Sequence, residues 1–193
     1  TGQWRAAKFV LDQRIASGKA TSDDLALLVR VLAHEPLKSE AIIALKARLD
    51  AKPLDPVASF VLGAMAHLDK DYAGSYSLLK TAAKGQPGQV GYLHTLQALN
   101  AISLGDMTSA KAALKRALER SPRDPETHWA VAEVVRDDEP LVAGRSLEIG
   151  LRLLPHRAMH AVRMTRQRDA LRSCDGKSPC KGPWRYRVIR SGR

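Results

Sequence analysis

The stretch that decides the fold is Gly91–Asp124, which reads GYLHTLQALNAISLGDMTSAKAALKRALERSPRD. Two runs rich in helix-favouring residues flank Gly105, a residue type that commonly ends a helix. Small residues occur in both runs, with Ala98 in the first and Ala110 and Ala117 in the second. Small side chains let two helices approach closely, so this stretch predicts a hairpin of two packed α-helices.

Prolines mark a period along the chain. Pro53, Pro87, Pro122 and Pro155 are separated by 34, 35 and 33 residues. A predicted helix precedes each of them, over Glu40–Asp50, Ala73–Lys84, Thr108–Glu119 and Leu141–Leu153. A proline beyond a helix stops it, because the ring cannot continue the hydrogen-bond ladder. A fixed period of this length predicts repeated helical hairpins.

The same period aligns residues of matching size. Small or medium residues recur in the first helix (Val29, Gly63, Ala98, Ala132) and in the second (Ala41, Ser75, Ala110, Ala143). Leucines recur one turn later, at Leu45, Leu79, Leu114 and Leu147. One hairpin cannot bury its own apolar face, so the pattern predicts hairpins stacked against each other.

This pattern resembles the tetratricopeptide repeat (TPR), which has a small residue in its first helix, alanines in its second and a closing proline. Leu62-Gly63 matches the Leu-Gly step of the family, and Gly91–Asp124 is the best single match. The first-helix Trp and Tyr of the family are mostly missing, and Trp129 lies one place from the expected Trp. Over about residues 3–157, the resemblance implies an all-α, right-handed α-solenoid that binds proteins and is not an enzyme.

The expected organisation follows from the alignment. We predict a half repeat at 1–20, repeats at 22–55, 56–89, 91–124 and 125–155, a capping helix at 156–173 and a basic tail at 174–193. Helix pairs should divide near Leu37, Lys70, Gly105 and Glu139. Gly2–Leu11 looks like a turn glycine followed by a second helix whose partner is absent. Trp4, Phe9 and Val10 would then need cover, so we expect further protein or another domain to pack at this end.

Charge is concentrated at the C-terminal end. The 193-residue chain has a net charge of +11, and residues 156–193 hold eleven Lys and Arg against two acidic residues, a net of +9. The basic tail mixes cations with aromatics at Lys181, Trp184, Arg185, Tyr186, Arg187 and Arg190. Such a tail either only solubilises the chain or contacts an acidic protein, nucleic acid or anionic lipid.

Motifs of catalysis and cofactor binding are missing from the sequence. It has no glycine-rich phosphate loop, no serine elbow and no closely paired metal-binding cysteines. Asp23-Asp24 follow Thr21-Ser22, which fits a helix N-cap and not an acid–base pair. The longest apolar run, Val57–Leu68, is too short to span a bilayer. We therefore predict no catalytic, cofactor or metal residues.

The two cysteines leave three alternatives open. Cys174 and Cys180 are separated by a segment with Gly and Pro, so a disulfide is sterically feasible and would imply an oxidising compartment. Free thiols are the second alternative, and a zinc site with His156 and His160 is the third. The disulfide alternative favours a periplasmic or membrane-associated protein over a cytoplasmic one.

The resemblance also implies a concave groove lined by first-helix side chains. By alignment these are Phe60, His67, Tyr92, Leu99, Trp129 and Glu133. Exposed aromatics in such a groove suit an apolar helix or an extended peptide. The carboxylate clamp of chaperone-binding members is not supported, because only Arg30 is basic among the comparable Ala26, Arg30, Phe60 and Ala64.

The resulting functional hypothesis is a noncatalytic scaffold or adaptor in a multiprotein assembly, with the bacterial envelope as its expected location. One alternative is binding of nucleic acid or an anionic membrane through the basic tail. Another is a regulatory TPR module of a larger enzyme.

Overall fold

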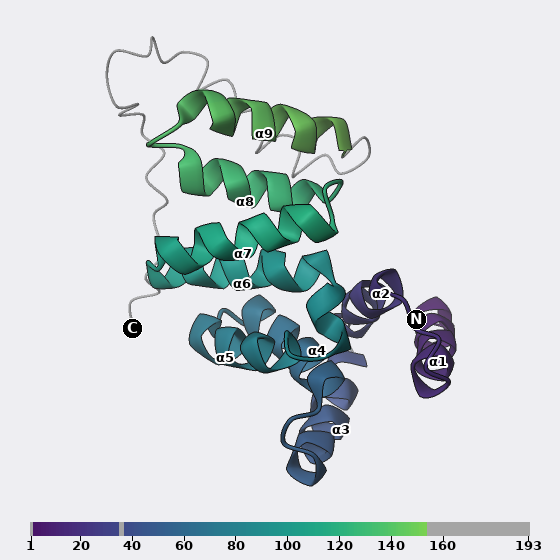
Figure 1. Ribbon diagram of the computed structural model, residues 1–193. Coiled ribbons are helices and arrows are strands. Elements are labelled where there is room, and N and C mark those ends of the chain that lie inside the picture. Colours follow the sequence, from purple (N-terminus) through teal and green to yellow (C-terminus); the bar gives the residue numbers. More distant parts are fainter. Residues whose placement is uncertain (1, 35–36, 154–193) are drawn as a thin grey trace.

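The structure is a computed structural model that describes residues 2–34 and 37–153 (Figure 1). Its described part is built from nine α-helices and one 3₁₀ helix, η1. The helices are α1 (Gly2–Ala16), α2 (Ser22–Leu32), α3 (Leu37–Ala51), α4 (Pro56–Leu68), α5 (Tyr72–Ala82), η1 (Gln86–Gln89), α6 (Gly91–Leu104), α7 (Met107–Arg120), α8 (Pro125–Val135) and α9 (Pro140–Leu153). The described residues contain no strand, so the all-α prediction is confirmed for them.

Aspartates begin four of these helices. The side chains of Asp55, Asp71, Asp106 and Asp124 each accept a hydrogen bond from the backbone N–H three residues later, at 2.9 to 3.1 Å. These bonds satisfy amides that have no partner within the helix. Proline follows Asp55 and Asp124 in the first turn, where it needs no amide hydrogen. Local sequence therefore fixes the starts of α4, α5, α7 and α8.

Three helix pairs pack as tight antiparallel hairpins: α4 with α5, α6 with α7, and α8 with α9 (Figure 1). The small residues predicted at the crossings are buried, among them Ser75, Ala110 and Ala143, which have no exposed surface. At Gly63 an added Cβ would lie 3.0 Å from the Leu79 side chain. The predicted small residues are thus buried in the hairpins, and at Gly63 a larger side chain would crowd Leu79.

The turns inside the hairpins lie where the alignment placed them, at 69–71, 105–106 and 136–139. The pair α2 and α3 is more open, because α3 runs away from the rest of the array (Figure 1). Ile43 on α3 is 73% exposed, and Arg48, aligned with the buried Ala82 and Ala117, is also exposed. The segment 22–55 therefore keeps the helix boundaries of a hairpin without its close packing.

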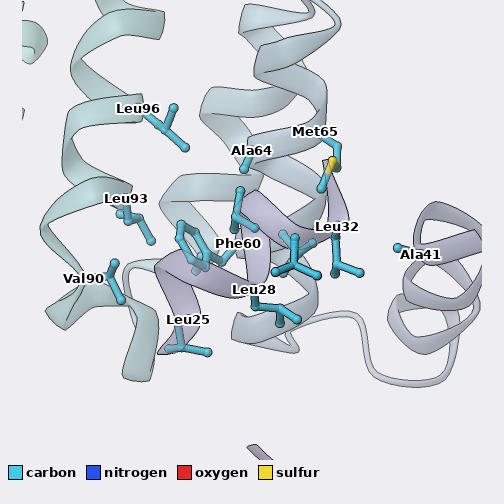
Figure 2. Packing of buried hydrophobic residues seen from close by; sticks show 14 of the residues in the cluster. Leu25, Leu28, Leu32, Ala41, Phe60, Ala64, Met65, Val90, Leu93 and Leu96 are labelled. Carbon is cyan, nitrogen blue, oxygen red and sulfur yellow. The ribbon is translucent and has the colours of Figure 1, made fainter. Parts of the chain in front are cut away.

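The core runs along the first helices of successive hairpins (Figure 2). Leu25 and Leu28 of α2 pack with Phe60 of α4 and with Leu93 and Leu96 of α6. A second cluster joins α6, α7 and α8. Neighbouring helix pairs therefore share their core clusters, as a stack of repeats requires.

Helix α1 covers one side of α2. Leu11 is buried there, and the Trp4 ring stacks on His34 with centroids 3.9 Å apart. Phe9 and Val10, predicted to need cover, are 64% and 57% exposed. The described helices include none that is both long and apolar enough to cross a membrane.

Several predictions fall outside the described residues. These are the closing Pro155, the capping helix at 156–173, the basic tail at 174–193 and the three alternatives for Cys174 and Cys180.

Candidate binding groove

A groove of about 530 Å³ opens between helix α2 and the start of helix α6. One wall is a face of α2, and the other combines the start of α6 with the loop between α7 and α8. We call it the α2–α6 groove. Its lining residues are Ser22, Asp23, Ala26, Leu27 and Arg30 on the first wall, and Val90, Gly91, Tyr92, Ser121, Pro122, Arg123 and Asp124 on the second.

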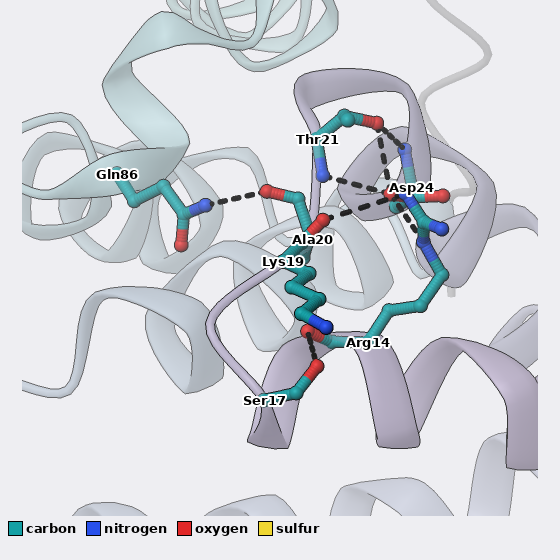
Figure 3. Close-up of polar contacts among 7 residues, drawn as sticks. All are labelled: Arg14, Ser17, Lys19, Ala20, Thr21, Asp24 and Gln86. Atoms are coloured by element: carbon teal, nitrogen blue, oxygen red, sulfur yellow. Dashed lines mark hydrogen bonds and ion pairs between the residues drawn. The ribbon is translucent and has the colours of Figure 1, made fainter.

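The α2 wall begins at a capping box (Figure 3). The Thr21 hydroxyl accepts from the Asp24 amide at 3.2 Å, and Asp24 accepts from the Thr21 amide at 2.7 Å. Arg14 of α1 donates to the same carboxylate at 2.8 Å. The backbone amide and hydroxyl of Thr21, with Arg14, hold the pKa of Asp24 below its ordinary value. This network fixes where α2 starts, as the Thr21–Asp24 prediction expected.

A long-range hydrogen bond joins the segments that precede the two walls. The Gln86 amide of η1 donates to the backbone carbonyl of Ala20 at 2.9 Å (Figure 3). Beneath it, Leu25 of α2 and Val90 before α6 share one buried cluster. The core and this bond therefore hold α2 beside η1 and the start of α6.

Histidine anchors the loop that forms the far wall. The Nε2 atom of His128 lies 2.8 Å from the carbonyl oxygen of Pro122, and His94 makes the equivalent contact with Gly88 at 2.9 Å. Both histidines thus hold the turn that precedes their own helix. Gly91 allows the loop to pass close to α6, since a Cβ there would lie 2.2 Å from the Ser121 hydroxyl oxygen.

Charged and aromatic groups meet at the groove. The Arg30 guanidinium lies over the Tyr92 ring, 5.7 Å from its centroid, in a cation–π arrangement. Arg123 stands on the opposite wall. Asp124 is engaged as the N-cap of α8, because it accepts from the Thr127 amide at 3.1 Å and from the Thr127 hydroxyl at 2.6 Å.

The six side chains predicted to line a groove do not lie together in the structure. Tyr92 lies in the groove wall. The prediction for Phe60 is wrong, because its ring is 0% exposed and packs among α2, α4 and α6. Its position in the first helix turns inward here, so a partner cannot reach it.

The other four predicted side chains are partly buried and lie outside this groove. His67 Nδ1 is 2.6 Å from the Asn100 side-chain oxygen, and Leu99 packs on the second core cluster. Trp129 packs between two clusters, and Glu133 pairs with Arg136 at 3.2 Å. These contacts give each residue a structural role.

Sequence reasoning missed most of the lining. Ala26 and Arg30 were aligned with groove positions, so that signal was available. No periodic signal marked Leu27 or Arg123. Leu27 reaches the groove because α2 stacks beside α6, and Arg123 because it lies in the loop after the closing Pro122. The groove is made by segments distant in sequence, which an alignment of single repeats cannot join.

The described residues show no built metal centre: no three His, Cys, Asp or Glu side chains gather there. Buried side-chain nitrogen and oxygen atoms in this part of the chain all have hydrogen-bond partners. One example is Asn100, which donates to the Ser75 hydroxyl at 2.7 Å, while Ser75 donates to the Gly63 carbonyl at 2.6 Å. These groups join helices to each other.

Comparison with known proteins supports the fold. No protein-family model matches the sequence, and no curated protein is significantly similar to it. Among solved structures, the chain matches the crystal structure of a thermophilic TPR protein of Thermus thermophilus with a TM-score of 0.58. The match has 22% sequence identity and covers 86% of this chain and 91% of that chain. The TPR-like hairpin fold expected from the sequence is thus confirmed.

Proposed function

We propose that this TPR-fold chain is a noncatalytic scaffold that binds a segment of a partner protein in the α2–α6 groove. The observation that carries the proposal is the groove itself, which is preformed, about 530 Å³ in volume and lined by both apolar and charged side chains. Apolar surface with a few fixed polar groups is the usual composition of a binding cleft.

The shape of the groove favours an extended segment over a globular surface. Its long wall is one face of α2, on which Ser22, Ala26 and Arg30 follow each other at intervals of one helical turn. Leu27 on this wall is 46% exposed and offers apolar contact. A partner side chain entering beside Leu27 would lose contact with water while its backbone remains outside.

Further parts of the proposal concern the whole chain. We infer that the hairpins continue a right-handed superhelix, that residues 156–173 cap it and that the scaffold serves a multiprotein assembly in the bacterial envelope. The location depends on a disulfide between Cys174 and Cys180, which a mass measurement on a thiol-blocked digest would test.

The test of groove binding is a pull-down with the full chain and a variant whose groove is filled. Ala26→Trp places a large ring on the α2 wall, while Ala112→Trp places it on the exposed face of α7. We expect Ala26→Trp to lose the copurified partner and Ala112→Trp to keep it. Because Ala26 packs partly against the core, a melting curve of each variant checks that it is folded at the temperature of the pull-down. Equal recovery of the partner by both variants would reject this groove as the binding site.

A second candidate function rests on charge. Residues 156–193 carry +9 of the net +11, which suits a polyanion. Deleting residues 181–193 should abolish binding to nucleic acid or anionic vesicles if that function holds, and the intact chain should lose affinity steeply with salt. Binding that is unchanged by the deletion would leave only a solubilising role for the tail.

A further inference from the structure

We propose that the basic tail of this chain, residues 174–193, docks on the turns of its own last two hairpins. These turns, residues 104–107 and 136–142, lie at one edge of the array (Figure 1), and we call them the turn edge. The surface is separate from the α2–α6 groove, so the inference does not depend on the proposed function of that groove.

Apolar side chains are exposed at the turn edge. Leu141, in the first turn of α9, is 82% exposed, and Leu104 and Met107 beside the α6–α7 turn are exposed as well. Lys111 lies one helical turn after Met107 and pairs with Asp138 at 3.5 Å, so the start of α7 lies beside the turn between α8 and α9. One segment of chain can therefore contact the exposed apolar residues of both turns.

The turn edge is also negative. Its net charge is −3, and it stays at −2 when the charged residues within one helical turn of it are added. The opposite edge, at the loops 83–90 and 120–124, has a net charge of +2. The charged residues are Asp106, Arg136, Asp137, Asp138 and Glu139 at the turn edge, Lys111, Glu133 and Arg145 within one helical turn of it, and Lys84, Arg120, Arg123 and Asp124 at the opposite edge.

Carboxylates of the turn edge can bind further cations. Asp137 pairs with Arg136 through Oδ1 at 3.2 Å, and Asp138 pairs with Lys111 through Oδ2. The two aspartate side chains are 78% and 69% exposed, and each has a second carboxylate oxygen with no hydrogen bond to a described residue. Pairing within the array therefore uses only part of the capacity of these carboxylates.

The sequence of the tail matches both features of the turn edge. Residues 174–193 carry six Lys and Arg against one Asp, a net charge of +5. Trp184, Tyr186 and Val188 alternate with Arg185 and Arg187, so apolar and cationic groups are adjacent throughout this stretch. A segment of this composition can bury apolar surface and pair with carboxylates in the same contact.

Charge distinguishes the turn edge from the exposed apolar surface of α1. Phe9 and Val10 are exposed on that helix, but its charged residues give it a net charge of +2. A basic segment would be repelled there, whereas the turn edge attracts it. The observations thus favour the turn edge as the docking surface of the tail.

The length of the chain allows the tail to reach the turn edge. Helix α9 has 14 residues, is about 20 Å long and ends at the edge opposite its turn. Residues 154–173 would span about 30 Å even as one continuous helix, which is enough to return along α9. A tether of this kind gives an effective concentration of about millimolar, so contacts too weak to hold a separate peptide are occupied within one chain. This favours the tail of the same chain over a second copy or another basic protein.

Cross-linking of the full chain tests the contact. A carbodiimide joins an amine to a carboxylate that touches it, so we expect links from Lys177 or Lys181 to Asp137, Asp138 or Glu139 as the main products of the tail. In a mixture of unlabelled and ¹⁵N-labelled chains, each link should join residues of one isotope. Links between isotopes, links mainly to carboxylates elsewhere, or no links from the tail would overturn the proposal.

The indole N–H signal of Trp184 in the NMR spectrum of the full chain gives a second readout. Trp184→Phe assigns the signal, and a synthetic peptide of residues 174–193 gives its position in the free tail. We expect a different position in the parent protein. Leu141→Ser, and separately Asp137→Asn with Asp138→Asn, should lower the docking constant by about two- to fivefold and move the signal toward that of the peptide. High salt should act in the same direction.

Two control variants carry the same kinds of change away from the turn edge. Leu54→Ser alters a residue that is 72% exposed in the loop between α3 and α4, and Asp50→Asn with Glu119→Gln removes two exposed carboxylates. Neither should move the Trp184 signal. A parent signal at the position of the free peptide would overturn the proposal, and so would equal movement in the control and turn-edge variants.

Discussion

Lys70 and Gly105 occupy the same turn of successive hairpins, and both have a left-handed backbone, with φ of 65° and 81°. Each is followed by the aspartate that caps the next helix, Asp71 or Asp106. The turn thus has one geometry in both hairpins, although only one carries the glycine that suits it.

Replacing Lys70 by glycine should stabilise the protein by about 1 kcal/mol, because a residue with a Cβ is strained in the left-handed region. Gly105→Ala should destabilise it by a similar amount, although its Cβ would meet no atom within 4 Å. Urea unfolding measures both. Lys70→Ala is the control, and its free energy of unfolding should rise little because alanine keeps the Cβ. A rise equal to that of Lys70→Gly would contradict the proposed strain from the positive φ.

Larger side chains at the crossing of α6 and α7 should lower the stability of the protein. Ala110 and Ala117 of α7 have no exposed surface, so leucine at either position should destabilise by about 1–3 kcal/mol through overpacking. Ala112 lies on the exposed face of the same helix and serves as the matched control. Thermal unfolding of the three variants tests this. If Ala110→Leu and Ala112→Leu melt alike, the crossing of α6 and α7 is assigned to the wrong face.

Asp55 should contribute to the loss of folding stability at acidic pH. Burial raises the pKa of its carboxyl, but hydrogen bonds from the Ala58 amide and the Arg48 guanidinium outweigh burial and leave the pKa below its ordinary 3.8. Its stabilising contribution is therefore present above pH 3.8 and is lost as pH falls through the lower folded-state pKa.

Asp55→Asn keeps a capping residue and removes the titration. The variant should be less stable than the parent at neutral pH, where its bond to Arg48 is weakened, and the difference should shrink in acid. Unfolding free energies measured from neutral to acidic pH check this, with the exposed Asp50→Asn as control. A constant difference between variant and parent across that range would rule out the titration of Asp55 as its cause.

Phe60 and Tyr92 should behave differently when shortened to alanine. Phe60→Ala removes a fully buried ring and should destabilise by about 3–5 kcal/mol. Tyr92 is partly exposed in the groove wall, so Tyr92→Ala should cost less stability and should weaken a groove ligand. Melting curves and peptide affinity for both variants distinguish the two roles. A strong loss of affinity in a stable Phe60→Ala protein would contradict the burial of this ring.

The helical hairpins and their crossings could be predicted from local sequence. Proline spacing, capping aspartates and recurring small residues each have a direct physical effect on where a helix begins, ends or approaches another. The turns at Lys70 and Gly105 and the buried Ala110 and Ala117 were predictable for this reason.

The stacking of the hairpins, in contrast, sets which first-helix side chains reach solvent and which segments form the α2–α6 groove. Phe60 and Tyr92 belong to the same class of aromatic first-helix residue, yet one lies in the core and the other in the groove wall. The difference arises from the stacking of α2 against α4 and α6, which the Gln86–Ala20 bond and the core around Leu25 hold in place. A repeat pattern specifies contacts between neighbours in sequence, whereas Arg30 and Arg123 share a groove only because the stacked array brings distant segments together.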